Sequence, residues 1–376
     1  MHIEEFSLER IQSLYENTVS YNLTESGLHP YSLREILTVD EQAQVLEMPL
    51  HYGQTNGDDV LRSKLAELYS RPECPLSEKN ILVTNGTAEA NFLATWALLN
   101  ADDHAIVVLP NYMQIPGLAR SLGVGISHVY LKEDESWRLD LDEVERQITN
   151  RTKAVFLCNP NNPTGQLIDP EQRARLVNIA AKNDLWIYCD EIYIGSELEG
   201  EETQSLLGLN AYDRIIVSSG LSKSYGLAGL RIGWTIAPEK FIEKLWSHRD
   251  YTSICSPLIS QKVAALILTP ERRSALLKRG RQVLRQNLAY LTEWTRAYGD
   301  DFSFVAPQAG GMAFVKYGYD INSSLLSQQL RREKSVFILP GDCFGLDGYL
   351  RLGIGQDPHI FQKGLELFGE FINKHF

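Results

Sequence analysis

The sequence lacks several features that would place it in common classes of protein. Five cysteines are spread over 376 residues, and none belongs to a Cys-x-x-Cys pair or to a Cys/His pattern with metal-ligand spacing. We therefore expect neither a disulfide framework nor a metal site. No run approaches the ~20 consecutive apolar residues of a membrane span. The N-terminus, Met-His-Ile-Glu-Glu, lacks the basic region and the apolar run of a signal peptide, so we expect a cytoplasmic protein.

Positive charge is also scarce. The chain has 36 Lys and Arg residues against 48 Asp and Glu residues, which gives a formal net charge of −12. This balance argues against a nucleic-acid groove or an anionic membrane surface as the partner. The length exceeds that of one ordinary hydrophobic core and suggests two domains.

Short apolar runs alternate with helical patterns through the first two thirds of the chain. This alternation is typical of an α/β fold with a largely parallel sheet and helices on both faces. The later part mixes strands and helices, which suits a smaller α+β domain, and we expect the N-terminal segment to pack with it. The expected strands of the sheet are 105–109, 126–131, 154–158, 185–190 and 215–218.

A lysine among small residues follows the last of these runs. Lys223 lies in the sequence Ser-Ser-Gly-Leu-Ser-Lys-Ser-Tyr-Gly, and Arg231 follows eight positions later. A lysine amine that loses its proton can form a Schiff base with a carbonyl group. An arginine supplies a fixed fork for a phosphate. The alternative is a solvated lysine at a strand end with a structural arginine.

Polar residues also follow two other expected strands. Asn85, Gly86, Thr87 and Ala88 lie between a strand and a helix, where free backbone N–H groups and the helix dipole can hold an anion. Thr87 also fits a plain helix cap. Asp190 ends a buried strand, where a carboxylate is costly unless it is paired. Ligands of open α/β sheets bind at the carboxyl ends of strands, so these groups are candidates for one site.

These motifs, with Asn-Pro-Asn-Asn-Pro-Thr-Gly at 159–165, resemble the class I/II aminotransferases of pyridoxal-phosphate fold type I. The resemblance implies pyridoxal 5′-phosphate as cofactor, an amino acid as substrate and a homodimer. It also implies a large domain with a mostly parallel seven-stranded sheet and a smaller α+β domain. We place the large domain at 36–265 and the small domain at 1–35 and 266–376.

The resemblance implies a role for each matching residue. The list is Lys223 for the Schiff base, Asp190 for the pyridine nitrogen, Asn162 and Tyr193 for the phenolic oxygen, Tyr112 for stacking on the ring, Gly86, Thr87, Ala88, Ser222 and Arg231 for the phosphate, Tyr52 for the phosphate of the neighbouring subunit, and Arg351 for the substrate α-carboxylate. Tyr112 fits a core tyrosine equally well. One position departs from the family pattern: Gly220 stands where the family often has a Ser or Thr that binds the phosphate.

The N-terminal segment suggests a reaction. Residues 25–31, Glu-Ser-Gly-Leu-His-Pro-Tyr, resemble the capreomycidine synthase-like branch, which cyclises hydroxylated arginines to capreomycidine- or enduracididine-like products. The resemblance implies that His29 assists the loss of water or holds the side chain, and that Glu25 or Ser26, beside Gly27, meets the guanidinium. His29 also fits a surface turn.

Two alternatives remain open at this point. An ordinary aminotransferase that uses a 2-oxo acid needs the same lysine. A non-catalytic regulatory module of this fold is usually fused to a DNA-binding domain, and we find no helix-turn-helix extension or basic stretch here.

Overall fold

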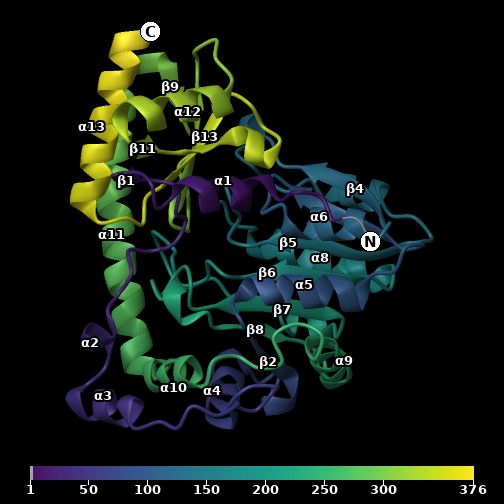
Figure 1. The fold of residues 1–376 in the computed structure, drawn as a ribbon. Helices are drawn as coiled ribbons and strands as arrows, with labels where there is room; N and C mark the ends of the chain where they lie inside the picture. The colour runs from purple at the N-terminus through teal and green to yellow at the C-terminus, as the bar shows by residue number, and fades with distance from the viewer. Residues whose placement is uncertain (1–2) are drawn as a thin grey trace.

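The computed structural model describes residues 3–376. Its centre is a seven-stranded sheet in the order β2-β8-β7-β6-β5-β3-β4 (Figure 1). All neighbouring strands are parallel except β8, which is antiparallel to β2 and to β7. The mostly parallel seven-stranded sheet of the prediction is thus confirmed. The strands are β2 (Ile81–Thr84), β3 (His104–Leu109), β4 (Gly125–Tyr130), β5 (Thr152–Cys158), β6 (Trp186–Asp190), β7 (Ile215–Gly220) and β8 (Gly233–Ile236).

Helices cover both faces of this sheet, because its strands are apolar on both sides. Ala105 and Val107 of β3 pack with α5, α6 and α9, whereas Ile106 and Val108 pack with α4, α8 and α10. The short helix α7 joins the second group. The bounds are α4 (Asp59–Tyr69), α5 (Thr87–Leu98), α6 (Gln114–Ser121), α7 (Leu141–Arg146), α8 (Pro170–Lys182), α9 (Glu239–Arg249) and α10 (Leu258–Ile267).

A smaller α+β part lies beside the sheet. It contains the four-stranded sheet β12-β13-β10-β9, whose strands pair antiparallel, and the long helix α11 runs from α10 towards it (Figure 1). Its core joins these strands to α11, α12 and α13. The elements are α11 (Pro270–Ala297), β9 (Phe302–Ser303), β10 (Met312–Tyr317), α12 (Ser323–Lys334), β11 (Val336–Phe337), β12 (Leu339–Pro340), β13 (Tyr349–Gly353) and α13 (Pro358–His375).

The N-terminal segment joins the two parts. Strand β1 (Tyr21–Asn22) pairs parallel with β11 of the smaller part. Helix α1 (Ser7–Tyr15) lies between the smaller part and the large sheet (Figure 1). Helices α2 (Leu33–Ile36) and α3 (Val39–Leu46) then lead to α4. The domain boundaries at 35/36 and 265/266 stay a prediction.

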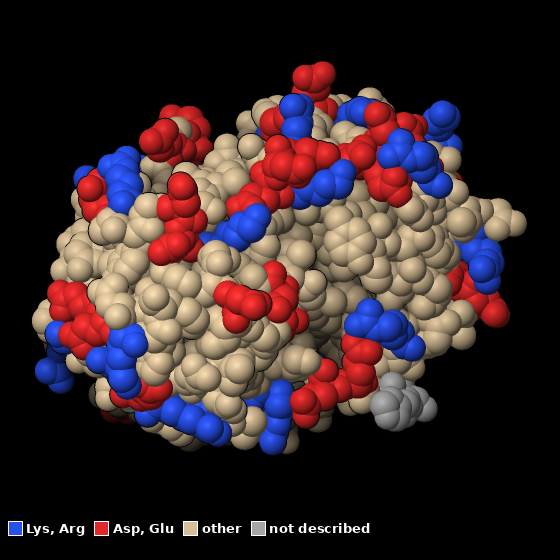
Figure 2. Space-filling view, turned by 90° about the horizontal axis from the view of Figure 1, so that it is seen from above, with Lys and Arg blue, Asp and Glu red and all other residues tan. Residues whose placement is uncertain are grey.

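Charged side chains of both signs lie on the surface of the molecule (Figure 2). Acidic and basic side chains are interspersed over the face shown in Figure 2, with no continuous basic patch on that face. Within residues 3–376, no helix has both the length and the apolarity needed to cross a bilayer. The same part of the chain contains no group of three or more His, Cys, Asp or Glu residues arranged to hold a metal ion.

Candidate active site

A cavity of about 330 Å³ opens at the carboxyl ends of β2, β5, β6 and β7. Each of these strands is followed by a chemically active residue, because parallel strands end at the same edge of a sheet. Most residues predicted from the sequence line this cavity: Glu25, Ser26, Thr87, Ala88, Tyr112, Asn162, Asp190, Tyr193, Ser222, Lys223, Arg231 and Arg351.

Lys223 lies in an ion pair with Glu25. Its Nζ donates a hydrogen bond to Glu25 Oε1 at 2.5 Å, and the same oxygen accepts the backbone N–H of Gly27 at 2.8 Å. Burial alone would raise the pKa of Glu25, but the Lys223 ammonium, the Arg351 charge and the Gly27 N–H together outweigh it and lower that pKa to about 2. Burial lowers the pKa of Lys223, whereas the charge of Glu25 raises it, and the net direction is upward.

Residues 25–27 can lie beside Lys223 because three neighbouring glycines have no side chain that would collide with their backbone. A Cβ on Gly353 would lie 2.1 Å from the Glu25 carbonyl oxygen, and one on Gly355 would lie 2.0 Å from the Gly27 carbonyl oxygen. Gly311 similarly approaches Ser26, at 2.4 Å. A larger side chain at any of these positions would push residues 25–27 away from Lys223.

Asp190 is a buried carboxylate at the end of β6. It accepts hydrogen bonds from the Asn91 side chain at 3.2 Å and from the Ile192 backbone N–H at 3.1 Å. Burial raises the pKa of Asp190 to about 6, although these donors act in the opposite direction. No ion pair to Asp190 forms within residues 3–376. A protonated ring nitrogen of a ligand would supply the missing positive charge.

An anion seat lies at the start of α5. The Thr87 hydroxyl is buried and has no hydrogen-bond partner in the described part of the chain. Gly86, with φ of +74°, precedes the helix, and a Cβ there would lie 2.6 Å from Nη2 of Arg231. The free N–H groups of the first turn, the hydroxyl and the guanidinium together fit a phosphate.

The departure at Gly220 has a steric reason. A Cβ at this position would lie 2.8 Å from the Ile232 carbonyl oxygen and 3.0 Å from Thr87 Oγ1. A serine or threonine at 220 would therefore crowd the Thr87 hydroxyl. Because Thr87 Oγ1 lies beside Gly220, it can make the phosphate contact that the family often takes from position 220.

The remaining predicted residues also line the cavity and contact one another. Arg351 donates from Nη1 to Asn162 Oδ1 at 2.9 Å, and its buried Nε has no partner among residues 3–376. Tyr193 and Ser26 share a hydrogen bond of 2.9 Å between their hydroxyl groups. Arg351 thus keeps a donor free for a ligand carboxylate.

Tyr112 lines the cavity and also packs against the hydrophobic core of the large sheet. Its hydroxyl donates to Glu9 Oε1 at 2.6 Å, and its ring packs edge-on against Phe6, with ring centroids 4.8 Å apart. Both partners come from the N-terminal segment around α1. The ring tyrosine predicted from the resemblance is therefore held by a segment that is far from it in the sequence.

Four predicted residues are not in the cavity lining: Gly27 and Gly86, which neighbour Lys223 and Arg231, and His29 and Tyr52, which lie farther from it. His29 lies outside the lining; its backbone N–H donates to Gly355 O at 2.6 Å, and its side chain acts electrostatically on Glu35. Its role in the loss of water stays a prediction with no geometric support. Tyr52 is 79% exposed, so a role in a neighbouring subunit remains open to it.

Helix α1 contributes residues that the sequence analysis missed. Glu9, Gln12 and Glu16, spaced by three and four positions, line the cavity from one face of the helix. Burial raises the pKa of Glu16, and the neighbouring charges of Glu25 and Glu9 raise it further. Their helical spacing was the available signal, but the sequence alone did not show which cavity that face covers.

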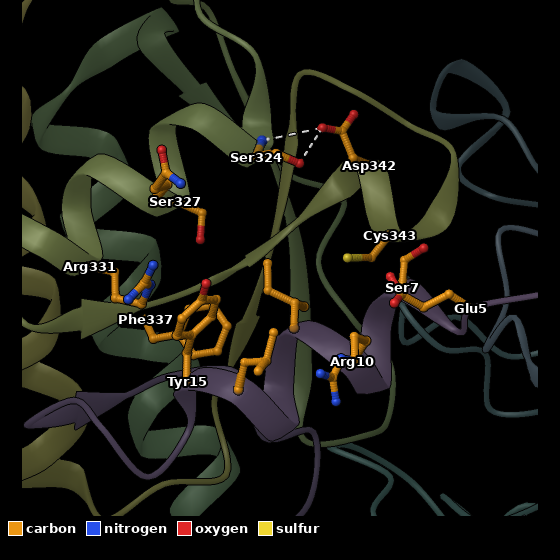
Figure 3. A pocket seen from close by; sticks show the side chains of 13 residues that line it. Glu5, Ser7, Arg10, Tyr15, Ser324, Ser327, Arg331, Phe337, Asp342 and Cys343 are labelled. Atoms are coloured by element: carbon orange, nitrogen blue, oxygen red, sulfur yellow. Dashed lines mark hydrogen bonds between the residues drawn. The ribbon is translucent and has the colours of Figure 1, made fainter.

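A second cavity, of about 450 Å³, lies between α1, α12 and residues 337–343 (Figure 3). Residues such as Arg10 and Tyr15 line it from α1, and Ser324 donates to Asp342 at its edge. Its one cysteine, Cys343, has a pKa raised to about 11 by burial and is a poor nucleophile. Among residues 3–376, no lysine lines this cavity, so it lacks the amine that Schiff-base chemistry needs.

A lysine at a strand end, a buried carboxylate and a phosphate seat define a pyridoxal-phosphate-dependent enzyme of fold type I. The chain belongs to the aminotransferase class I and II family, whose model matches residues 28–365. It is an enzyme, and its cofactor is pyridoxal 5′-phosphate. The predicted family, fold and cofactor are thus confirmed.

Three relatives illustrate the range of this family. The chain is 28% identical to capreomycidine synthase of Streptomyces vinaceus, with 94% of this chain and 90% of that protein covered. It is 29% identical to an aspartate aminotransferase of Sulfolobus acidocaldarius, covering 86% and 82%. The crystal structure of a PLP-dependent aminotransferase from Streptococcus suis matches with a TM-score of 0.92 at 30% identity, covering 100% and 99%.

Proposed function

We propose that this enzyme cyclises a hydroxylated L-arginine to a cyclic guanidine amino acid by loss of water. The observation that carries the proposal is the acidic side of the cavity, where Glu9, Glu16 and Glu25 face the space above Lys223. With the α-carboxylate bound by Arg351 and Glu25 paired with Lys223, Glu9 and Glu16 would be left for a cationic side chain. Similarity to capreomycidine synthase over 94% of the chain supports the same reaction class.

Each residue has a task in this reaction. Arg351 holds the α-carboxylate and Asp190 holds the ring nitrogen of the cofactor, while Arg231 and Thr87 hold its phosphate. Bound pyridoxal phosphate stores the electron pair that the α-carbon releases with its proton. Lys223 would accept that proton at Nζ.

The side-chain hydroxyl of the substrate would then leave with a proton as water; for a γ-hydroxyl, a β-proton is also removed. A guanidine nitrogen would add to the carbon that carried the hydroxyl, and the proton given up by the guanidine, with any β-proton removed, would return to the substrate carbon skeleton. The product is the substrate minus one water, with no change in oxidation state. A β-hydroxyl gives a capreomycidine-like ring, and a γ-hydroxyl gives the five-membered, enduracididine-like ring. Glu9 on α1 and Glu16, at the C-cap of α1, line the cavity and would hold the guanidinium near the reacting carbon.

A second candidate is an ordinary aminotransferase that passes the amino group to a 2-oxo acid. Identity of 29% to an aspartate aminotransferase favours it as strongly as the sequence similarity favours cyclisation. The acidic residues above Lys223 argue against a dicarboxylic substrate such as aspartate, because a second carboxylate would face like charges.

Incubation with β- and γ-hydroxyarginine distinguishes the two candidates. We expect a product one water lighter than the substrate, formed without any 2-oxo acid, as measured by mass spectrometry and proton NMR. L-Aspartate with 2-oxoglutarate is the matched control and should give no amine transfer. Amine transfer that requires a 2-oxo acid, with no dehydrated product, would reject cyclisation.

We also propose that the enzyme acts as a homodimer in which Tyr52 reaches the phosphate seat of the partner subunit. Members of the family generally act as dimers. Tyr52 belongs to an exposed, largely apolar stretch that includes Val39, Leu46 and Leu50, which are 79%, 84% and 85% exposed. Burial of such a stretch against a second copy would remove it from water.

A further inference from the structure

We propose that Glu25 is the counter-ion of Lys223 that keeps the catalytic proton on the lysine nitrogen, and not the ligand of the substrate guanidinium. The carboxylate contacts Nζ directly, at 2.5 Å. Within residues 3–376, no other carboxylate forms an ion pair with this lysine. The inference deepens the proposed function, because it assigns the proton that the proposed reaction moves.

The Glu25 segment also has contacts that do not involve Lys223. The Gly27 backbone N–H donates to Glu25 Oε1, and residues 25–27 lie against the backbone of Gly311, Gly353 and Gly355. These contacts involve backbone atoms and do not depend on Lys223. The side chains of Lys223 and Glu25 are 26% and 35% exposed, so both face the cavity.

The other charged groups around Lys223 act from farther away. Arg351 on β13 lowers the pKa of the lysine, and Tyr193 after β6 raises it. Asp190 on β6 and Glu16 at the C-cap of α1 also interact with the lysine charge, but neither hydrogen-bonds to it. Glu25 is therefore the group whose removal changes the proton affinity of this nitrogen most.

This arrangement gives the proton a defined route. When Lys223 takes the α-proton, the C–H bond breaks, an N–H bond forms, and the ammonium is stabilised by Glu25. The same ammonium can then give its proton to the departing hydroxyl: the N–H and C–O bonds break, an O–H bond forms, and water leaves. Lys223 returns to the neutral amine, so the step needs no further acid.

The test measures protonation in the resting holoenzyme, without substrate. The visible absorbance spectrum of the bound cofactor changes when the nitrogen that joins it to Lys223 loses its proton. Glu25→Gln removes a negative charge but keeps the size of the side chain. Because an opposite charge at contact distance shifts a pKa by about one to three units, we expect the midpoint of this titration to fall by at least about one pH unit.

Two further variants make the result specific. Glu16→Gln removes a carboxylate from the same cavity without touching Lys223 and should move the midpoint by less than half as much. Glu25→Asp keeps the charge and should restore most of the wild-type midpoint. An unchanged midpoint in Glu25→Gln, or equal shifts in Glu25→Gln and Glu16→Gln, would overturn the inference. Failure of the cyclisation assay would leave this titration unaffected, so the two proposals fail separately.

Discussion

Replacing Lys223 by alanine is expected to lower the rate of product formation at least about 10⁴-fold, because one nitrogen both forms the bond to the cofactor and accepts the substrate proton. The visible absorbance of the lysine-bound cofactor should disappear as well. Lys240→Ala, an exposed lysine on α9 outside the cavity lining, is the matched control and should behave as wild type. Retention of both activity and colour in Lys223→Ala would contradict the assignment.

The same variant tests the shared site of the proposed dimer. In a homodimer of Lys223→Ala neither active site works. In a homodimer of Tyr52→Ala both active sites bind the phosphate more weakly. After mixing, unfolding and reassociation, a hybrid dimer contains one site with an intact lysine from one subunit and an intact tyrosine from the other. We expect activity of the mixture to exceed that of either variant, whereas no gain would count against Tyr52 acting across the interface.

Replacing Arg351 by leucine is expected to lower kcat/KM for the amino acid substrate about 10²- to 10³-fold, mainly through KM. Arg351 is almost completely buried, and its Nε has no hydrogen-bond partner within residues 3–376. This N–H group can donate to a carboxylate. Arg351→Lys keeps the charge but loses the fork, so an intermediate loss is expected.

Steady-state kinetics with a second substrate separates this role from a structural one. Arg351 also donates to Asn162 and to the Thr24 carbonyl oxygen, so its loss can disturb the site in other ways. The decarboxylated analogue of the substrate lacks the group that Arg351 holds. Wild type and Arg351→Leu should therefore convert this analogue at similar rates. An equal loss with both substrates would show that Arg351 only supports the fold.

The sheet, and the site residues that come at the ends of its strands, could be predicted from the sequence because both depend on the local pattern of apolar and polar residues. Apolar runs alternate with helices, and such an order leads to a mostly parallel sheet whose strand ends meet at one edge. Thr87, Asp190 and Lys223 follow three of these strands and line the same cavity.

The other side of the site could not be predicted, because it depends on packing between distant segments. Glu25 and Lys223 are 198 residues apart, and their contact depends on glycines in a third segment. The acidic face of α1 is visible as a helical spacing, but only the fold shows that it covers the cavity. The prediction for His29 rested on a short motif, and the structure places this residue outside the lining.

The covalent bond between Lys223 and pyridoxal phosphate is the claim on which the rest depends. Reduction of the holoenzyme with borohydride makes this bond permanent, and trypsin digestion with mass spectrometry locates it. Trypsin does not cleave at a modified lysine, so the account predicts a single adduct on the peptide of residues 215–231, at Lys223. An adduct on another lysine, or normal cleavage after Lys223 with no adduct, would contradict it.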